Sequence, residues 1–258
     1  MSERVTLDRD GAVAFIEICR PERHNALDVE TAKAFLERCR EVDRDDGVRA
    51  VVLSGQGASF GVGGDLNELK VDPPRTARKI IAPLHEAVAL LASMDAPVVA
   101  KLRGIVAGGS MSLALACDLA IASEDVRFNF AYTNAGTTAD LGGSWHLPRI
   151  VGLRNALQIA LLNETIDATR AHALGVVSKV VSGEQLDAEV SSLAHRLAGG
   201  PTKALGRMKR LLRQSATSGL DAHLAVELTT FVESARTSDF REAVDALLGK
   251  RPPRFTGA

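Results

Sequence analysis

The chain has 258 residues, of which 46% are hydrophobic and 24% are charged. This balance excludes a wholly disordered, collagen-like or coiled-coil protein, because a chain of this length and composition can bury a large core. Thirty-one Lys and Arg against 32 Asp and Glu leave a formal net charge of −1, so no global field draws the chain to nucleic acid or anionic lipid.

The N-terminus and the cysteines indicate a reducing compartment. The first residues, 1–4, are charged from the start and lack the apolar stretch of a secretory signal. The longest charge-free apolar stretch, residues 104–117, is shorter than the ~20 residues that span a bilayer. The three cysteines are an odd number and form no CxxC pair. We therefore expect a cytoplasmic protein that binds no membrane.

The first half of the chain alternates the periodicities of strands and helices. Strands are predicted at residues 5–7, 12–18, 48–54 and 97–102, where β-branched runs are bounded by Gly, Asp or Pro. Helical spacing covers residues 28–43, with Asp28 as a capping residue, and residues 76–94, where Pro83 should kink or restart the helix. This order predicts an α/β sheet with buried strands.

The strand signal nearly disappears from about residue 153 onward. Helical stripes run through residues 153–162, 184–197, 201–213, 220–233 and 239–248. We predict one structural unit with a core at residues 1–195 and a C-terminal helical extension at residues 196–258. The extension should cover the sheet or reach a neighbouring subunit.

Several common site motifs are missing from the sequence. It contains no GxxxxGK[ST] phosphate loop, no HExxH, no GxSxG elbow and no paired Cys/His pattern, so we expect no metal site. Lys203, Arg207, Lys209, Arg210 and Arg213 form a basic helix without nearby aromatic residues. Such a helix is more often a solvated face than a nucleic-acid site, and we expect no nucleic-acid partner.

Two glycine-rich loops follow predicted strands. Residues 55–65 hold five glycines in eleven positions, and residues 104–110 precede a helix predicted at residues 111–116. Glycine is entropically costly, which indicates positive φ angles or a close approach of the backbone. Amides at the start of a helix also carry positive partial charge and can hold a developing oxyanion. Taken alone, a loop of this kind is more often an ordinary tight turn.

Six short segments, taken together and in order, resemble the crotonase superfamily, also called the enoyl-CoA hydratase/isomerase family. They are RPERHNAL at 20–27, SFGVGGDL at 59–66, APVVA at 96–100, GIVAGG at 104–109, ACDLAIA at 116–122 and LGVV at 174–177. The resemblance implies a crotonase-like ββα spiral with a C-terminal helical trimerisation layer. It also implies a homotrimer or hexamer and an acyl-CoA substrate, with coenzyme A as part of the thioester and no permanently bound cofactor.

The resemblance also assigns roles to residues of the two loops. By position, the amides of Gly64 and Gly109 would form an oxyanion hole for the thioester carbonyl. Arg23, Ala26, Gly63 and Leu66 fall in the segments that hold the CoA nucleotide in the family. Arg23 suits phosphate because its forked guanidinium is always charged. A basic segment like Lys250-Arg251 often reaches the nucleotide from another subunit, although solvated surface charge accounts for Lys250 equally well.

Two departures from the hydratase pattern favour an isomerase. Family hydratases carry glutamates at the positions that here hold Ser112 and Tyr132. Neither side chain is a carboxylate able to activate water at neutral pH. Both could hydrogen-bond the substrate or simply pack. An enoyl-CoA hydratase with an unusual site stays an alternative.

Asp140 stands where some relatives place a working aspartate, among them dienoyl-CoA isomerases, ring-1,2-epoxyphenylacetyl-CoA isomerases and chlorobenzoyl-CoA dehalogenases. GGSWHLPR at 142–149 and GKRPPRFTG at 249–257 look most like the epoxyphenylacetyl-CoA isomerase branch. The resemblance thus implies a catalytic acid/base at Asp140, whose pKa an apolar pocket would raise. From the residues alone, Asp140 before two glycines is also a typical helix N-cap.

His85 lies where the dehalogenases carry a histidine that assists hydrolysis, and this position makes it a candidate substrate-site residue. Its place on an apolar helical stripe also fits a buried histidine with satisfied hydrogen bonds. Two alternatives to an isomerase therefore stay open besides the hydratase. One is a hydrolytic acyl-CoA enzyme with Asp140 as nucleophile and His85 as base, and the other is a non-catalytic acyl-CoA binder.

Overall fold

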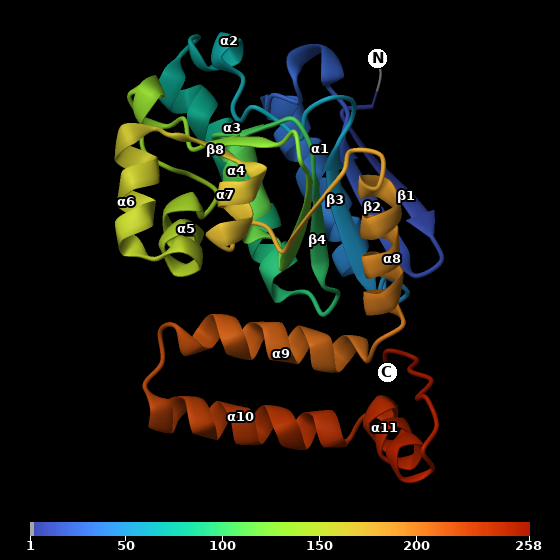
Figure 1. Cartoon of the computed structure of the whole chain (residues 1–258). Coiled ribbons are helices and arrows are strands. Elements are labelled where there is room, and N and C mark those ends of the chain that lie inside the picture. The colour runs from blue at the N-terminus through green and yellow to red at the C-terminus, as the bar shows by residue number, and fades with distance from the viewer. Residues whose placement is uncertain (1–2) are drawn as a thin grey trace.

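Two sheets and a separate helical layer organise residues 3–258, the part of the chain that this computed structural model describes (Figure 1). Met1 and Ser2, which open the charged N-terminal segment, lie outside the described residues. The larger sheet has six strands in the order β1-β2-β3-β4-β6-β9, and all neighbours are parallel except β1 and β2. The smaller sheet has the order β5-β7-β8. The strands are β1 Val5–Asp10, β2 Val13–Ile18, β3 Ala50–Gly55, β4 Val98–Leu102, β5 Ile105–Ala107, β6 Leu119–Ser123, β7 Arg127–Asn129, β8 Thr165–Asp167 and β9 Lys179–Val181.

Helices follow most strands and cover both faces of the larger sheet. The α-helices are α1 Val29–Asp43, α2 Leu66–Leu69, α3 Pro73–Ser93, α4 Gly109–Ala116, α5 Gly143–Val151, α6 Leu153–Leu162, α7 Ala168–Ala173, α8 Leu186–Ala198, α9 Thr202–Ser215, α10 Leu220–Ala235 and α11 Ser238–Leu248. Two 3-10 turns occupy Pro21–Arg23 and Thr133–Ala135. The α/β class predicted from the sequence is confirmed.

The apolar stripes seen in the sequence become the core. Helix α1 starts where Asp28 accepts a hydrogen bond from the Thr31 amide at 2.7 Å, as its capping role predicts. It buries Phe35, Leu36 and Cys39 in the main apolar cluster, which also includes residues of α3 and α4. On the other face of the sheet, α8 packs in a second cluster with side chains from β2, β3, β4 and β6.

Two elements differ from what the sequence suggested. Of the two outcomes expected at Pro83, a restart is excluded, because α3 runs from Pro73 to Ser93 with Pro83 inside it. The region after residue 153 also contains two strands, β8 and β9. Each has three residues, too few for an alternating pattern to emerge from the sequence.

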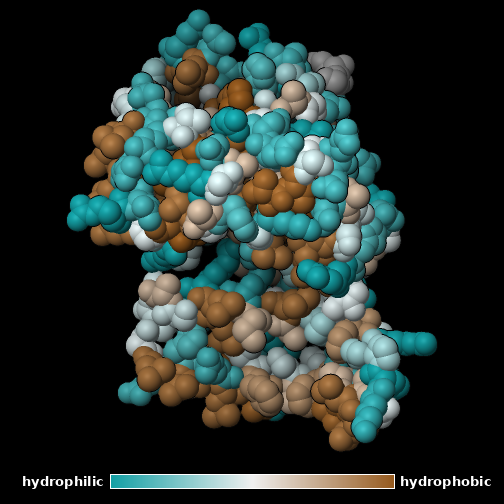
Figure 2. Space-filling view, in the orientation of Figure 1, coloured by the Kyte–Doolittle hydropathy of each residue, from teal (hydrophilic) through white to brown (hydrophobic). Residues whose placement is uncertain are grey.

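Helices α9, α10 and α11 form a layer below the sheets, and a hollow separates much of this layer from the upper body (Figures 1 and 2). Lys209 of α9 crosses to the body, where its Nζ donates to Asp118 at 2.9 Å and to the carbonyls of Leu91 and Ala96. Arg213 donates to the other Asp118 oxygen at 2.8 Å. The predicted solvated basic face is therefore wrong for these two residues, which attach α9 to the core.

No helix within residues 3–258 combines the length and the apolar character needed to cross a bilayer.

Candidate active site

The two glycine-rich loops lie against each other at the end of the sheet. The Gly61 amide donates to the Ile105 carbonyl at 3.0 Å, and the Ala107 amide donates back to Gly61 at 2.9 Å. Gly63 has a φ of +87°, and a Cβ added to it would lie 2.8 Å from the Gly109 amide nitrogen. Glycine is required at this position because the two backbones approach so closely.

Buried side chains hold the loops in this arrangement. Asn25 is fully buried, and its amide group donates to the carbonyls of Ser59 at 2.7 Å and Gln56 at 3.0 Å. Ser110 Oγ accepts from the Gly63 amide at 3.0 Å and so links the first loop to the start of α4. Sequence reasoning assigned no role to Ser110, since a lone serine in a glycine-rich loop carries no signal of such a partner.

Gly64 and Gly109 line one cavity of about 510 Å³. Gly109 is the first residue of α4, so its amide has no partner inside the helix. Within residues 3–258, neither the Gly64 nor the Gly109 amide donates a hydrogen bond to another group of the chain. Two residues of the cavity wall thus have backbone amides without a partner in the described chain, and one of these amides lies at the positive end of a helix.

Asp140 brings a carboxylate to the same cavity. A Cβ added to Gly109 would lie 3.4 Å from Asp140 Oδ1, which places that oxygen directly beside the second loop. Asp140 does not cap α5: the N-cap is Gly142 and receives no side-chain bond. The capping interpretation is therefore wrong, and the backbone carbonyl of Asp140, not its carboxylate, accepts from the Gly143 amide.

Asp140, Tyr132 and Ser112 are joined by hydrogen bonds. The Tyr132 hydroxyl donates to Asp140 Oδ1, and Ser112 Oγ lies 2.8 Å from the same hydroxyl. Burial raises the pKa of Asp140, an effect that the Tyr132 hydrogen bond and the nearby His85 partly oppose. Burial and the Asp140 charge raise the pKa of Tyr132, which therefore stays a neutral donor. Tyr132 lines the cavity, whereas Ser112 lies behind it.

His85 lies on the other side of the Asp140 turn. Its Nε2 accepts a hydrogen bond from the Leu141 amide at 3.1 Å, so the expectation of satisfied hydrogen bonds is met at this nitrogen. The side chain is exposed, however, and the expectation of burial is wrong. His85 lines a separate cavity of about 570 Å³ together with Leu141, Gly142 and His146. It does not line the cavity of Gly64 and Gly109.

The other predicted substrate-site residues divide into two groups. Arg23, Ala26 and Leu66 line the cavity, and Leu66 is 68% exposed at its surface. Gly63 does not line the cavity, and its amide donates to Ser110 Oγ. Arg251 forms two hydrogen bonds to Glu242 of its own chain. Among residues 3–258, no three His, Cys, Asp or Glu side chains form a group that could hold a metal ion.

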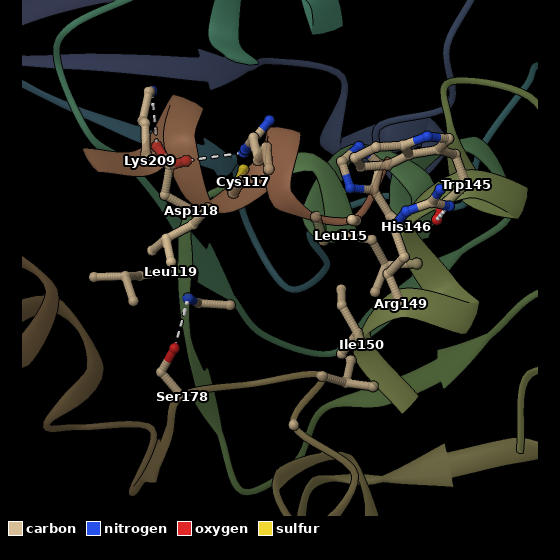
Figure 3. A pocket seen from close by; sticks show the side chains of 17 residues that line it. Leu115, Cys117, Asp118, Leu119, Trp145, His146, Arg149, Ile150, Ser178 and Lys209 are labelled. Atoms are coloured by element: carbon tan, nitrogen blue, oxygen red, sulfur yellow. Dashed lines mark hydrogen bonds and ion pairs between the residues drawn. The ribbon is translucent and has the colours of Figure 1, made fainter. Parts of the chain in front are cut away.

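Figure 3 shows a further cavity, between α4, α5 and α9, which contains none of the predicted site residues. Its polar wall is the Asp118–Lys209 contact that attaches α9. His146 lies on the opposite wall, and burial lowers its pKa to about 4. A histidine with that pKa is neutral under ordinary conditions, and the cavity offers no pair of free amides beside a carboxylate.

Comparison with known proteins places this geometry in a family. A family model described as enoyl-CoA hydratase/isomerase matches residues 8–258. The chain is 35% identical to the 1,2-epoxyphenylacetyl-CoA isomerase of Escherichia coli (strain K12), with 100% of both chains aligned. It is 31% identical to 4-chlorobenzoyl coenzyme A dehalogenase-2 of Arthrobacter sp, with 92% of this chain and 88% of that protein aligned. The crystal structure of an enoyl-CoA hydratase from Polaromonas sp. JS666 matches with a TM-score of 0.92 and 32% identity, over 97% of this chain and 99% of that one.

These matches confirm the resemblance seen in the sequence and the crotonase-like fold. The relatives carry three different activities, so the reaction has to be argued from the site itself. The chain belongs to the enoyl-CoA hydratase/isomerase family.

Proposed function

We propose that this chain is an acyl-CoA isomerase that transfers a proton through a thioester enolate. The observation that carries the proposal is the position of Asp140, which lines the same cavity as Gly64 and Gly109 and whose carboxylate lies beside Gly109. A carboxylate next to two fixed donors is the arrangement that removal of a proton alpha to a thioester requires.

The proposed reaction has two proton transfers. The Gly64 and Gly109 amides bind the thioester oxygen as an oxyanion hole, and Asp140 takes a proton from a carbon of the acyl group. The electron pair of the broken C–H bond moves into the enolate, whose charge the amides hold. With an enoyl ester, Asp140 then returns the proton to a different carbon, so the double bond shifts. With an epoxy ester, the electron pair of the enolate breaks the adjacent carbon–oxygen bond of the ring, and Asp140 returns the proton to the alkoxide oxygen. Neither reaction gains or loses atoms.

The residues around Asp140 favour an isomerase over a hydratase. The family's usual hydratase glutamates are replaced by Ser112 and Tyr132, which bond to each other, and Tyr132 also donates to Asp140. Neither can act as a base toward water at neutral pH. His85 is a poor base for a hydrolytic reaction at Asp140, because its Nε2 already accepts from Leu141 and the ring faces another cavity.

The remaining parts of the proposal concern coenzyme A and assembly. We place the CoA moiety of the substrate along the cavity mouth, where Arg23, Ala26 and Leu66 lie. Arg23 is exposed there and would pair with phosphate. We also propose that the chain works as a homotrimer or hexamer, since α9 and α10 expose several large apolar residues in the single chain.

A panel of saturated, enoyl and epoxy acyl-CoA esters, followed by mass spectrometry, tests the activity. We expect an enoyl or epoxy ester to rearrange at constant mass, and Asp140→Asn to lose about 10²- to 10⁴-fold in rate. Asp46→Asn, an exposed carboxylate without a hydrogen-bond partner in the described chain, is the matched control and should keep full rate. A gain of one water would indicate a hydratase, and ¹⁸O from solvent in a released acid would indicate a hydrolase.

Binding of these esters with no turnover would leave only an acyl-CoA binder. Full turnover by Asp140→Asn on every converted substrate would overturn the assigned role of Asp140.

A further inference from the structure

The three bonded side chains of the site form one directed chain. An ionised carboxylate can accept hydrogen bonds but cannot donate, so Tyr132 donates its hydroxyl proton to Asp140. The Tyr132 oxygen is then free to accept from Ser112, at 2.8 Å. The Ser112 hydroxyl thus donates to Tyr132, and the Tyr132 hydroxyl donates to Asp140 Oδ1.

Packing from three segments keeps the chain in place. Ser112 is fully buried on α4, and a Cβ added to Gly143 of α5 would lie only 2.2 Å from its Oγ. The ring of Tyr132 packs edge-on against Phe130, with centroids 4.9 Å apart and planes at 71°. Tyr132 is itself only 7% exposed. This packing restrains both side chains in the positions that form the two hydrogen bonds.

The hydrogen bonds from Ser112 through Tyr132 end on only one of the two oxygens of Asp140. Oδ1 is the acceptor for Tyr132. Oδ2 makes no hydrogen bond to the chain within residues 3–258. The residue's other close titratable neighbour is His85 on α3, which is itself turned toward the Leu141 amide.

We propose that Tyr132, supported by Ser112, is a positioning residue that holds Oδ1 of Asp140 and leaves Oδ2 to carry the proton. The proposal rests on the proposed proton transfer by Asp140. It assigns Tyr132 no bond to the substrate: its effect on the reaction passes through the carboxylate.

The same chain determines how readily Asp140 ionises. Burial favours the neutral acid, and the Tyr132 hydrogen bond favours the carboxylate. A hydrogen bond to a charged group is strong enough to move a pKa by about one to two units. Removing the Tyr132 hydroxyl should therefore make Asp140 a carboxylate only at higher pH, while the Phe130 contact stays intact in a phenylalanine variant.

A first experiment needs no substrate, because Tyr132 is the only tyrosine in the sequence. Labelling with ¹³C at the tyrosine Cζ gives one NMR resonance, which is followed from about pH 4 to about pH 9. We expect the resonance to shift as Asp140 ionises, to stop doing so in Asp140→Asn, and to shift at a higher pH in Ser112→Ala. If the chemical shift of the wild type does not change with pH, or changes in the same way in Asp140→Asn, the proposal is overturned.

A second experiment uses the rate. In Tyr132→Phe the acidic limb of the kcat/KM profile should move to higher pH by about one to two units, and Ser112→Ala should move it less in the same direction. Above the limb Tyr132→Phe should recover most of its rate. If Tyr132→Phe loses rate at all pH values and the acidic limb of its profile stays at the wild-type pH, Tyr132 takes part in the reaction directly. That result would overturn its positioning role. If no acyl-CoA is turned over but the NMR titration is as expected, the proposed function fails and the Tyr132–Asp140 link stands.

Discussion

Gly63 has no room for a side chain and also has a positive φ angle. The effect of the steric contact can be separated from the effect of the φ angle by comparison with Gly11. Gly63→Ala should destabilise the fold by about 1–2 kcal/mol through φ strain and should also displace the Gly109 amide. Gly11 also has a positive φ, of +57°, but nothing lies within 4 Å of an added Cβ. We expect Gly11→Ala to lower the free energy of unfolding by a similar amount and to keep the wild-type kcat/KM. Gly63→Ala should lower both the free energy of unfolding and kcat/KM. A wild-type kcat/KM in Gly63→Ala would contradict the proposed role of this contact.

Asp140 should also influence the pH dependence of folding. Because burial raises its pKa in the folded chain, the folded state binds the proton more tightly than the unfolded chain does. Its contribution to stability is therefore present below the unfolded pKa and is lost as pH rises through the folded pKa. Between about pH 4 and about pH 8, the melting temperature of the wild type should fall further than the melting temperature of Asp140→Asn. Equal pH dependence in the two proteins would indicate that the Asp140 carboxyl is not perturbed.

At the scale of elements, one buried arginine joins the starts of two helices. Arg20 lies 3.2 Å from Asp28, the cap of α1, and 3.1 Å from Asp65, the cap of α2. Burial opposes ionisation of Asp65, but hydrogen bonds from Arg20 and the Asn67 amide outweigh it and lower its pKa. The ion pairs therefore support the segment that presents Gly64.

Breaking these pairs should be costly. Arg20→Met leaves the buried Asp65 without its cation and leaves Asp28 only Arg4, at 3.6 Å, so we expect a loss of about 3–5 kcal/mol in denaturant unfolding. Arg9→Met removes an exposed pair with Asp45 and should change stability by less than about 1 kcal/mol. If both variants unfold at the same denaturant concentration, Arg20 does not have this structural role.

Elements with a strong local signal could be predicted from the sequence. The period of α1 and its cap, and the stripe of α6 at residues 153–162, predicted helices that the structure contains. Strands β5, β7 and β8 could not be predicted from the local sequence. Each has only three residues and forms a strand by pairing with a segment far away in the chain. The family resemblance led to Gly64, Gly109 and Asp140. The bonds of Tyr132 to Asp140 and of His85 to Leu141 depend on side-chain directions that no spacing encodes.

At the scale of the molecule, the helical layer exposes apolar side chains (Figure 2), which neighbouring subunits would cover in the proposed assembly. Six large side chains of α9 and α10 are at least half exposed: Met208 56%, Leu212 66%, Leu220 72%, Leu224 50%, Leu228 68% and Phe231 64%. We expect light scattering to give a trimer or hexamer for the wild type and a smaller species for Leu228→Lys. Asp46→Lys, on an exposed loop, should keep the wild-type mass. A monomeric wild type would contradict the proposed assembly.

Exchange of substrate hydrogen with solvent tests the central claim most directly, since it reports the enolate and no later step. In D₂O, wild-type enzyme given an acyl-CoA should incorporate deuterium next to the thioester carbonyl, as read by mass spectrometry. Asp140→Asn should not, and Asp46→Asn should match the wild type. Exchange at the wild-type rate in Asp140→Asn would contradict the account.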